Sequence, residues 1–184
     1  MSLTPSNMPD LGSPMPAFRL ADPAGKEVSS DDLRGRPILV AFLCNHCPFV
    51  KHVADAFADF AREYQARGLA VVAINSNDFH RHPADSPPRM IEESRSRGYD
   101  FPYLVDESQE VARAFDAACT PDFFLFDADH RLAYRGQFDD SRPSKDTPVT
   151  GADLRAAADA VLAGRAPDAD QKPSMGCNIK WKPA

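Results

Sequence analysis

The amino-acid sequence predicts an α/β protein, because two apolar runs flank an amphipathic helix. Residues 38–43 form an apolar run rich in branched and aromatic side chains, which is typical of a buried strand. Residues 47–67 follow with apolar side chains at helical spacing, and Gly68 is placed to end that helix. Residues 69–74 form a second fully apolar run, which favours a central parallel strand covered on both faces.

The length and charge of the chain favour one domain and exclude two classes of partner. The 184 residues contain no internal repeat. The chain has 21 Lys and Arg residues and 27 Asp and Glu residues, which gives a net charge of −6. No basic cluster suits nucleic acid, and no apolar run approaches the roughly 18 residues of a membrane span. The first 20 residues also lack the apolar core of a signal peptide, so we expect a cytoplasmic protein.

The chain divides into an arm, a domain and a tail. We expect residues 1–15 to lack regular structure and residues 16–163 to form the domain. Residues 164–184 read as irregular, but their apolar end predicts that this tail packs back on the domain. The further expected elements are strands at 17–20, 26–28, 103–105, 122–126 and 132–135, helices at 89–97, 107–115 and 151–162, and a polar loop at 75–88.

The motif CNHC at residues 44–47 lies where the first strand ends and the helix starts. Pro48 follows it, and proline is tolerated only in the first turn of a helix. The free N–H groups and the dipole of a helix N-terminus lower a thiol pKa and favour a reactive thiolate. Four cysteines are too few for a disulfide framework, so the motif indicates redox or metal chemistry.

Six short stretches, in their order and spacing, resemble the thioredoxin-like proteins of the alkyl hydroperoxide reductase and thiol-specific antioxidant (AhpC/TSA) superfamily. The resemblance implies a thioredoxin fold, with three α/β/α layers around a mixed central sheet. An N-terminal β-hairpin and a packed C-terminal tail are expected to extend it. The matching stretches are residues 16–20, 32–35, 44–48, 101–106, 119–123 and 176–181.

The resemblance also implies a thiol-disulfide site. Cys44 is expected to be the exposed attacking sulfur and Cys47 the resolving sulfur. Pro121, preceded by Thr120, is expected in cis facing the two sulfurs, where it offers an unpaired backbone edge to a bound peptide. Leu43 departs from the family, because many thioredoxin-like proteins have Trp before the first cysteine.

The remaining candidates each allow two interpretations. Protonated His46 stabilises a Cys44 thiolate, or it is a solvated loop residue. Cys119 is a third redox thiol near Pro121 or a small core residue. Cys177 lies near the active site or only anchors the tail.

No metal ion or other cofactor is expected. Four cysteines and His46 offer soft ligands, but a structural zinc site usually shows a second close pair. Cys119 and Cys177 are 58 residues apart and do not form such a pair.

These observations favour a dithiol-disulfide oxidoreductase that acts on a protein or small-molecule disulfide or dithiol and is served by an unidentified electron donor. The alternative enzyme is a peroxiredoxin-like peroxidase, in which Cys47 attacks peroxide. Cys47 followed by proline fits that motif, but Cys44 and Val40 stand where its Thr and Pro are expected. A third class is a non-enzymatic metal-binding or redox-sensing protein.

Overall fold

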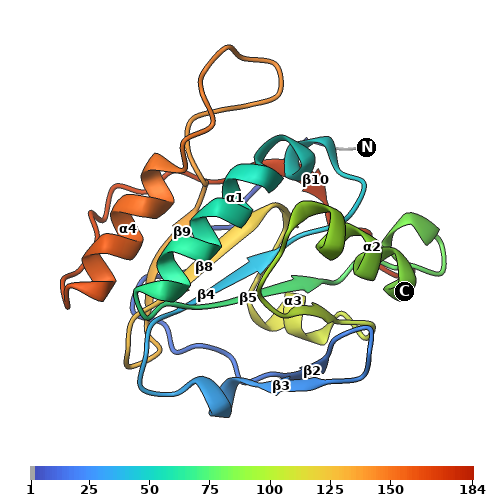
Figure 1. The fold of residues 1–184 in the computed structure, drawn as a ribbon, viewed down its shortest axis with the longest axis horizontal. Coiled ribbons are helices and arrows are strands. Elements are labelled where there is room, and N and C mark those ends of the chain that lie inside the picture. The colour runs from blue at the N-terminus through green and yellow to red at the C-terminus, as the bar shows by residue number, and fades with distance from the viewer. Residues whose placement is uncertain (1–2) are drawn as a thin grey trace.

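A seven-stranded sheet with the order β3-β2-β6-β5-β4-β8-β9 forms the centre of the fold (Figure 1). The structure is a computed structural model and describes residues 3–184. Both β4 and β5 are buried along their whole length, as expected for central strands. The strands of this sheet are β2 (Arg19–Ala21), β3 (Glu27–Ser29), β4 (Ile38–Phe42), β5 (Ala70–Asn75), β6 (Tyr103–Val105), β8 (Asp122–Phe126) and β9 (Leu132–Gly136).

The sheet is mixed, as the family resemblance implies. β4 pairs in parallel with β5 and antiparallel with β8, while β5 pairs in parallel with β6. β2 and β3 form the predicted N-terminal hairpin, and β8 and β9 form the second hairpin. The loops after β4 and β5 therefore leave the sheet at the same edge, because the two strands run in the same direction.

Helices cover both faces of the sheet. α1 (Pro48–Ala66), α2 (Pro87–Arg97) and α4 (Ala152–Leu162) lie on one face, and α3 (Glu110–Ala114) lies on the other (Figure 1). Side chains alternate along β4, so Leu39 packs on the α1 side and Val40 on the α3 side. The short 3₁₀ helices are η1 (Ser30–Leu33) and η2 (Pro83–Asp85). Over residues 3–184, no helix has both the length and the apolar character needed to cross a membrane.

A small three-stranded sheet joins the two ends of the chain to the site. Its strands are β1 (Leu3–Pro5), β10 (Met175–Asn178) and β7 (Cys119–Thr120), with β10 in the middle. β10 contacts α1 and lies near the N-terminal end of that helix (Figure 1).

Three sequence-based expectations differ from this structure. An arm without regular structure was expected over residues 1–15, whereas β1 forms there; residues 1 and 2 lie outside the described part. The expected irregular tail contains β10, because β1 and β7 supply backbone partners from distant parts of the chain. α2 begins at Pro87 inside the expected 75–88 loop, since proline fits the first turn of a helix.

Gly176 allows β10 to approach β7 closely. A Cβ atom added at Gly176 would lie 2.0 Å from the carbonyl oxygen of Thr120. We expect Gly176→Ala to lower the free energy of unfolding by about 3 kcal/mol, because the backbones must separate. Urea unfolding followed by circular dichroism measures this loss.

Gly12→Ala is the matched control, because an added Cβ there meets open space and only the left-handed backbone at φ +86 opposes it. Its expected loss is about 1 kcal/mol. If Gly176→Ala is as stable as the unmodified protein, β10 does not pack on β7 in the way described.

Candidate functional site

The CNHC loop connects β4 to α1 and brings both of its sulfurs to the helix N-terminus. Cys47 is the N-cap residue of α1, and Pro48 is the first helical residue. Cys44 is 2% exposed and Cys47 is fully buried. The expectation of an exposed sulfur at Cys44 is therefore wrong: both sulfurs belong to the core cluster that also holds Cys177 of β10.

Thr120 contacts both sulfurs of the motif. The Cys44 Sγ lies 3.3 Å from the Thr120 hydroxyl oxygen, and the Cys47 Sγ lies 3.4 Å from the Thr120 carbonyl oxygen. The Thr120–Pro121 peptide bond is cis, as the family resemblance implies. The site therefore joins segments that are more than 70 residues apart in the sequence.

The backbone edge in front of Pro121 is already paired. Cys177 of β10 lies opposite Thr120 in an antiparallel register, and Asn178 lies opposite Cys119. The expected unpaired edge for a bound peptide is therefore absent from the described structure. The chain's own C-terminal strand occupies it.

The environment of Cys47 favours a thiolate. Hydrogen bonding from the Cys44 thiol lowers the pKa of Cys47, burial raises it, and the Cys177 thiol and two backbone N–H groups lower it further, to about 5. One of these N–H groups belongs to Val50 in the first turn of α1. The negative charge of the resting dithiol is therefore placed on Cys47.

Cys44 is the protonated partner of this pair. Burial, the hydrogen bond to Cys47 and the negative charge of Asp85 all raise the pKa of Cys44, and the Thr120 hydroxyl only partly offsets them. This result differs from the sequence-based expectation, in which Cys44 carried the thiolate. The main reasons are the burial of Cys44 and its hydrogen bond to Cys47, and the nearby carboxylate of Asp85 adds to them.

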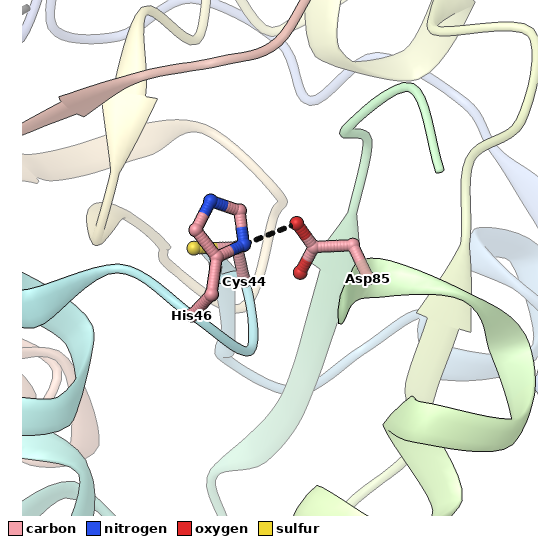
Figure 2. A group of neighbouring side chains, drawn as sticks. All are labelled: Cys44, His46 and Asp85. Atoms are coloured by element: carbon pink, nitrogen blue, oxygen red, sulfur yellow. Dashed lines mark ion pairs between the residues drawn. The ribbon is translucent and has the colours of Figure 1, made fainter. Parts of the chain in front are cut away.

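His46 and Asp85 form an ion pair beside Cys44 (Figure 2). The His46 Nδ1 lies 2.6 Å from a carboxylate oxygen of Asp85. This contact raises the pKa of His46, against burial, which lowers it. Because the positive charge of His46 is matched by Asp85, little of it remains to stabilise a thiolate on Cys44.

Asp85 holds the CNHC loop in place. Its Oδ1 accepts hydrogen bonds from the Asn45 backbone at 2.7 Å and the Asn75 side chain at 3.1 Å, and its Oδ2 accepts one from Asn77 at 3.0 Å. Burial would raise the pKa of Asp85, but His46, Asn45 and Asn77 together lower it. The carboxylate is therefore ionised.

Asp85 is the site residue that the sequence analysis missed. It lies in the segment after β5, within a stretch expected to be a polar loop. One signal was available, because loops after adjacent parallel strands meet at one sheet edge, and the CNHC loop follows the adjacent strand β4.

Three side chains of the site also have the composition of a metal-binding group. Possible ligand atoms of Cys44, His46 and Asp85 all lie within 4.8 Å of one another. Thiolate, imidazole and carboxylate together suit zinc. The sequence pattern did not indicate this group, because the third member is 39 residues beyond His46.

Cys119 and Cys177 occupy different environments. The Cys119 thiol donates to the Pro121 carbonyl at 3.6 Å, and burial raises its pKa far above the ordinary range. Cys177 hydrogen bonds to Cys47 through its thiol and its backbone. Of the two expected additional thiols, Cys177 is thus the one in hydrogen-bonding contact with the CNHC pair.

Comparison with known proteins assigns the chain to a family. The AhpC/TSA family profile matches residues 11–135, which is more than half of the chain. The chain belongs to the AhpC/TSA family. Among its relatives are the thiol-disulfide oxidoreductase ResA of Bacillus subtilis, 26% identical over 66% of this chain, and the chloroplastic peroxiredoxin Q of Suaeda salsa, 30% identical over 69%. The matches span 64% and 60% of those proteins, less than two thirds of either.

Solved structures agree on the fold. A crystal structure of an uncharacterized conserved protein from Geobacillus kaustophilus is 50% identical and superimposes with a TM-score of 0.97, covering 100% of this chain and 98% of its own. A thiol:disulfide interchange protein of the thioredoxin family from Chlorobium tepidum has a TM-score of 0.64 at 21% identity, covering 84% and 99%. This AhpC/TSA family protein therefore has the thioredoxin fold that the sequence predicted.

The charge on Cys47 gives a direct pH prediction. Since the pKa of Cys47 is lowered to about 5, its thiolate forms as the pH rises through that value and is complete at neutral pH. We expect the ultraviolet absorbance of the thiolate to titrate with a midpoint near 5 in the unmodified protein. This transition disappears in Cys47→Ser and persists in the control Cys119→Ser. A transition that survives in Cys47→Ser would place the charge on another sulfur.

Proposed function

We propose that the chain is a thiol-disulfide oxidoreductase that cycles between the Cys44–Cys47 dithiol and disulfide. The observation that supports this most strongly is the pairing of a thiolate-favouring Cys47 with a protonated Cys44 at the N-terminus of α1. A dithiol reductant needs both states, one sulfur to attack and a second to displace the bound product. The ResA relative carries the name of this activity.

The reaction transfers two electrons from the dithiol to the substrate. The Cys47 thiolate attacks one sulfur of a substrate disulfide, forms a mixed disulfide and releases the other substrate sulfur as a thiolate. The Cys44 thiol then gives its proton to that thiolate and attacks the Cys47 sulfur, which releases the second substrate thiolate. The protein ends as the Cys44–Cys47 disulfide, and a dithiol electron donor restores it.

This order reverses the roles that the sequence predicted for the two cysteines. The family resemblance implied Cys44 as the attacking sulfur and implied that this sulfur is exposed. Both sulfurs are buried, so exposure does not distinguish them, and the distribution of charge favours Cys47.

The burial of the site supports a proposal about the class of substrate. Because both sulfurs are covered, we infer that a small-molecule disulfide enters more readily than a protein disulfide, which requires β10 to move. We further propose a reducing compartment such as the cytoplasm, in which the four free thiols remain reduced.

Single serine substitutions test the exchange reaction. We expect Cys47→Ser to abolish reduction of oxidised glutathione, because it removes the attacking sulfur. Cys44→Ser retains the first attack but loses the Cys44–Cys47 product. Rapid quenching with acid, followed by mass mapping of the sulfurs, measures both effects.

Cys119→Ser is the matched control, since it changes another buried thiol beside Pro121 and is expected to leave exchange unchanged. If Cys47→Ser forms a glutathione adduct on Cys44, the order of attack is the one predicted from sequence. If both Cys44→Ser and Cys47→Ser retain full turnover, the dithiol does not carry the activity.

A peroxidase is the second candidate, and the lowered pKa of Cys47 favours it. A Cys47 thiolate attacks hydrogen peroxide to form sulfenate and release water, and Cys44 then condenses with the resulting sulfenic acid to form the same disulfide and a second water. Peroxiredoxin Q is among the relatives. The two candidates share the product and differ in the oxidant that reacts quickly.

Metal binding is the third candidate, supported by the group of Cys44, His46 and Asp85. We expect the purified protein to hold no zinc or copper above trace stoichiometry, because Asp85 already accepts hydrogen bonds from three groups and pairs with His46. Elemental analysis before and after treatment with a chelator measures this. One full equivalent of metal per chain would favour the metal-binding function over the oxidoreductase.

A further inference from the structure

We infer that Cys177 is a third redox thiol. It attacks the Cys47 sulfur when Cys47 is part of a disulfide, and the product is a Cys47–Cys177 disulfide between the CNHC motif and strand β10. This inference rests on the proposed function and extends it, because it adds a second disulfide to the cycle. The inference is based on the antiparallel pairing of β10 with β7, which places Cys177 opposite Thr120.

β10 occupies the place that the family resemblance assigns to a bound peptide. It pairs antiparallel with β7, with Cys177 directly opposite Thr120. Thr120 in turn contacts both sulfurs of the CNHC motif. Cys177 thus stands where a substrate cysteine on a paired peptide would stand.

β10 is held firmly in this register. Gly176 leaves no room for a side chain against the Thr120 carbonyl, and the Ser174 hydroxyl donates to the Pro121 carbonyl. On its other side β10 pairs with β1. The backbone of β10 is therefore fixed, and its Cys177 thiol lies in the same buried cluster as Cys47 and hydrogen bonds to it.

The first turn of α1 supplies a backbone N–H donor to each of two sulfurs, those of Cys47 and Cys177. The backbone N–H of Val50 donates to Cys47, and that of Phe49 donates to Cys177. Burial, together with the hydrogen bond and the charge of the Cys47 thiolate, raises the pKa of Cys177 to about 12 in the resting state. When Cys47 enters a disulfide, its charge is lost, whereas Phe49 and Lys180 still lower the pKa of Cys177. Oxidation of Cys47 therefore makes Cys177 easier to ionise.

The transfer is an isomerisation and needs no further oxidant. The Cys177 thiolate attacks the Cys47 sulfur, and a bond forms between them while the bond from Cys47 to its earlier partner breaks. That partner, either Cys44 or a substrate sulfur, leaves with the electron pair and takes the proton that Cys177 lost. If the partner is Cys44, its thiol is regenerated; if it is a substrate sulfur, the substrate thiol is released. In both cases the two-electron oxidation ends on the chain as the Cys47–Cys177 disulfide.

The test follows a glutathione adduct on Cys47. Reduced Cys44→Ser and the double variant Cys44→Ser/Cys177→Ser are mixed with oxidised glutathione, quenched with acid and mapped by mass spectrometry. In Cys44→Ser we expect the adduct to convert to a Cys47–Cys177 disulfide. In the double variant we expect the adduct to last at least about tenfold longer, because the intramolecular attack is lost. Cys44→Ser/Cys119→Ser is the matched control and should behave as Cys44→Ser.

The outcomes separate this inference from the proposed function. Equal adduct lifetimes in Cys44→Ser and in the double variant would overturn the role of Cys177 and leave the exchange reaction intact. No adduct in the double variant would overturn both. Disulfide mapping of the oxidised unmodified protein gives an independent check, since a Cys47–Cys177 peptide is expected there beside the Cys44–Cys47 peptide, and its absence would contradict the inference.

Discussion

The N-terminus of α1 is the feature on which the rest of the site depends. β4 ends just before the CNHC motif, and Pro48 fixes the first helical residue, so Cys47 must stand at the helix cap. The free N–H groups of the first turn then face Cys47 and Cys177 rather than solvent. The reactivity of the dithiol is therefore a consequence of where the strand stops and the helix begins.

Asp85 provides the second constraint, because it holds the CNHC loop and adds to the difference between the two cysteines. Its carboxylate is ionised, lies beside Cys44 and is held by the Asn45 backbone and two asparagine side chains. The pKa of Cys44 is raised first by burial and by its hydrogen bond to Cys47, and further by this charge, while Cys47 lies under the helix N-terminus. His46 neutralises Asp85 below the raised pKa of its own ring. As the pH rises through the pKa of His46, the ring loses its charge, and the stability that the ion pair contributes is lost. As the pH falls through the lowered pKa of Asp85, the carboxylate is protonated, and the same contribution is lost.

The sequence predicted the parts of the fold that depend on local pattern. The expected strand at 38–43 and helix at 47–67 correspond to β4 and α1, because apolar periodicity and Pro48 act within a few residues. Asp85 and β10 were missed, since each acts on residues far away in the sequence. The pairing of Cys177 with Thr120 joins positions 57 residues apart. No local sequence pattern indicates which strand the C-terminal segment will pair with.

The central claim is that Cys44 and Cys47 form a couple for disulfide exchange, and the most direct test compares two oxidants. Fully reduced protein is mixed rapidly with oxidised glutathione and, separately, with hydrogen peroxide, and the sulfurs are then mapped by mass. We expect fast thiol loss with the disulfide, slow loss with peroxide, and a Cys44–Cys47 bridge as the first intramolecular product. Fast loss with peroxide, sulfenic acid on Cys47 and no reaction with the disulfide would contradict the claim and identify a peroxidase.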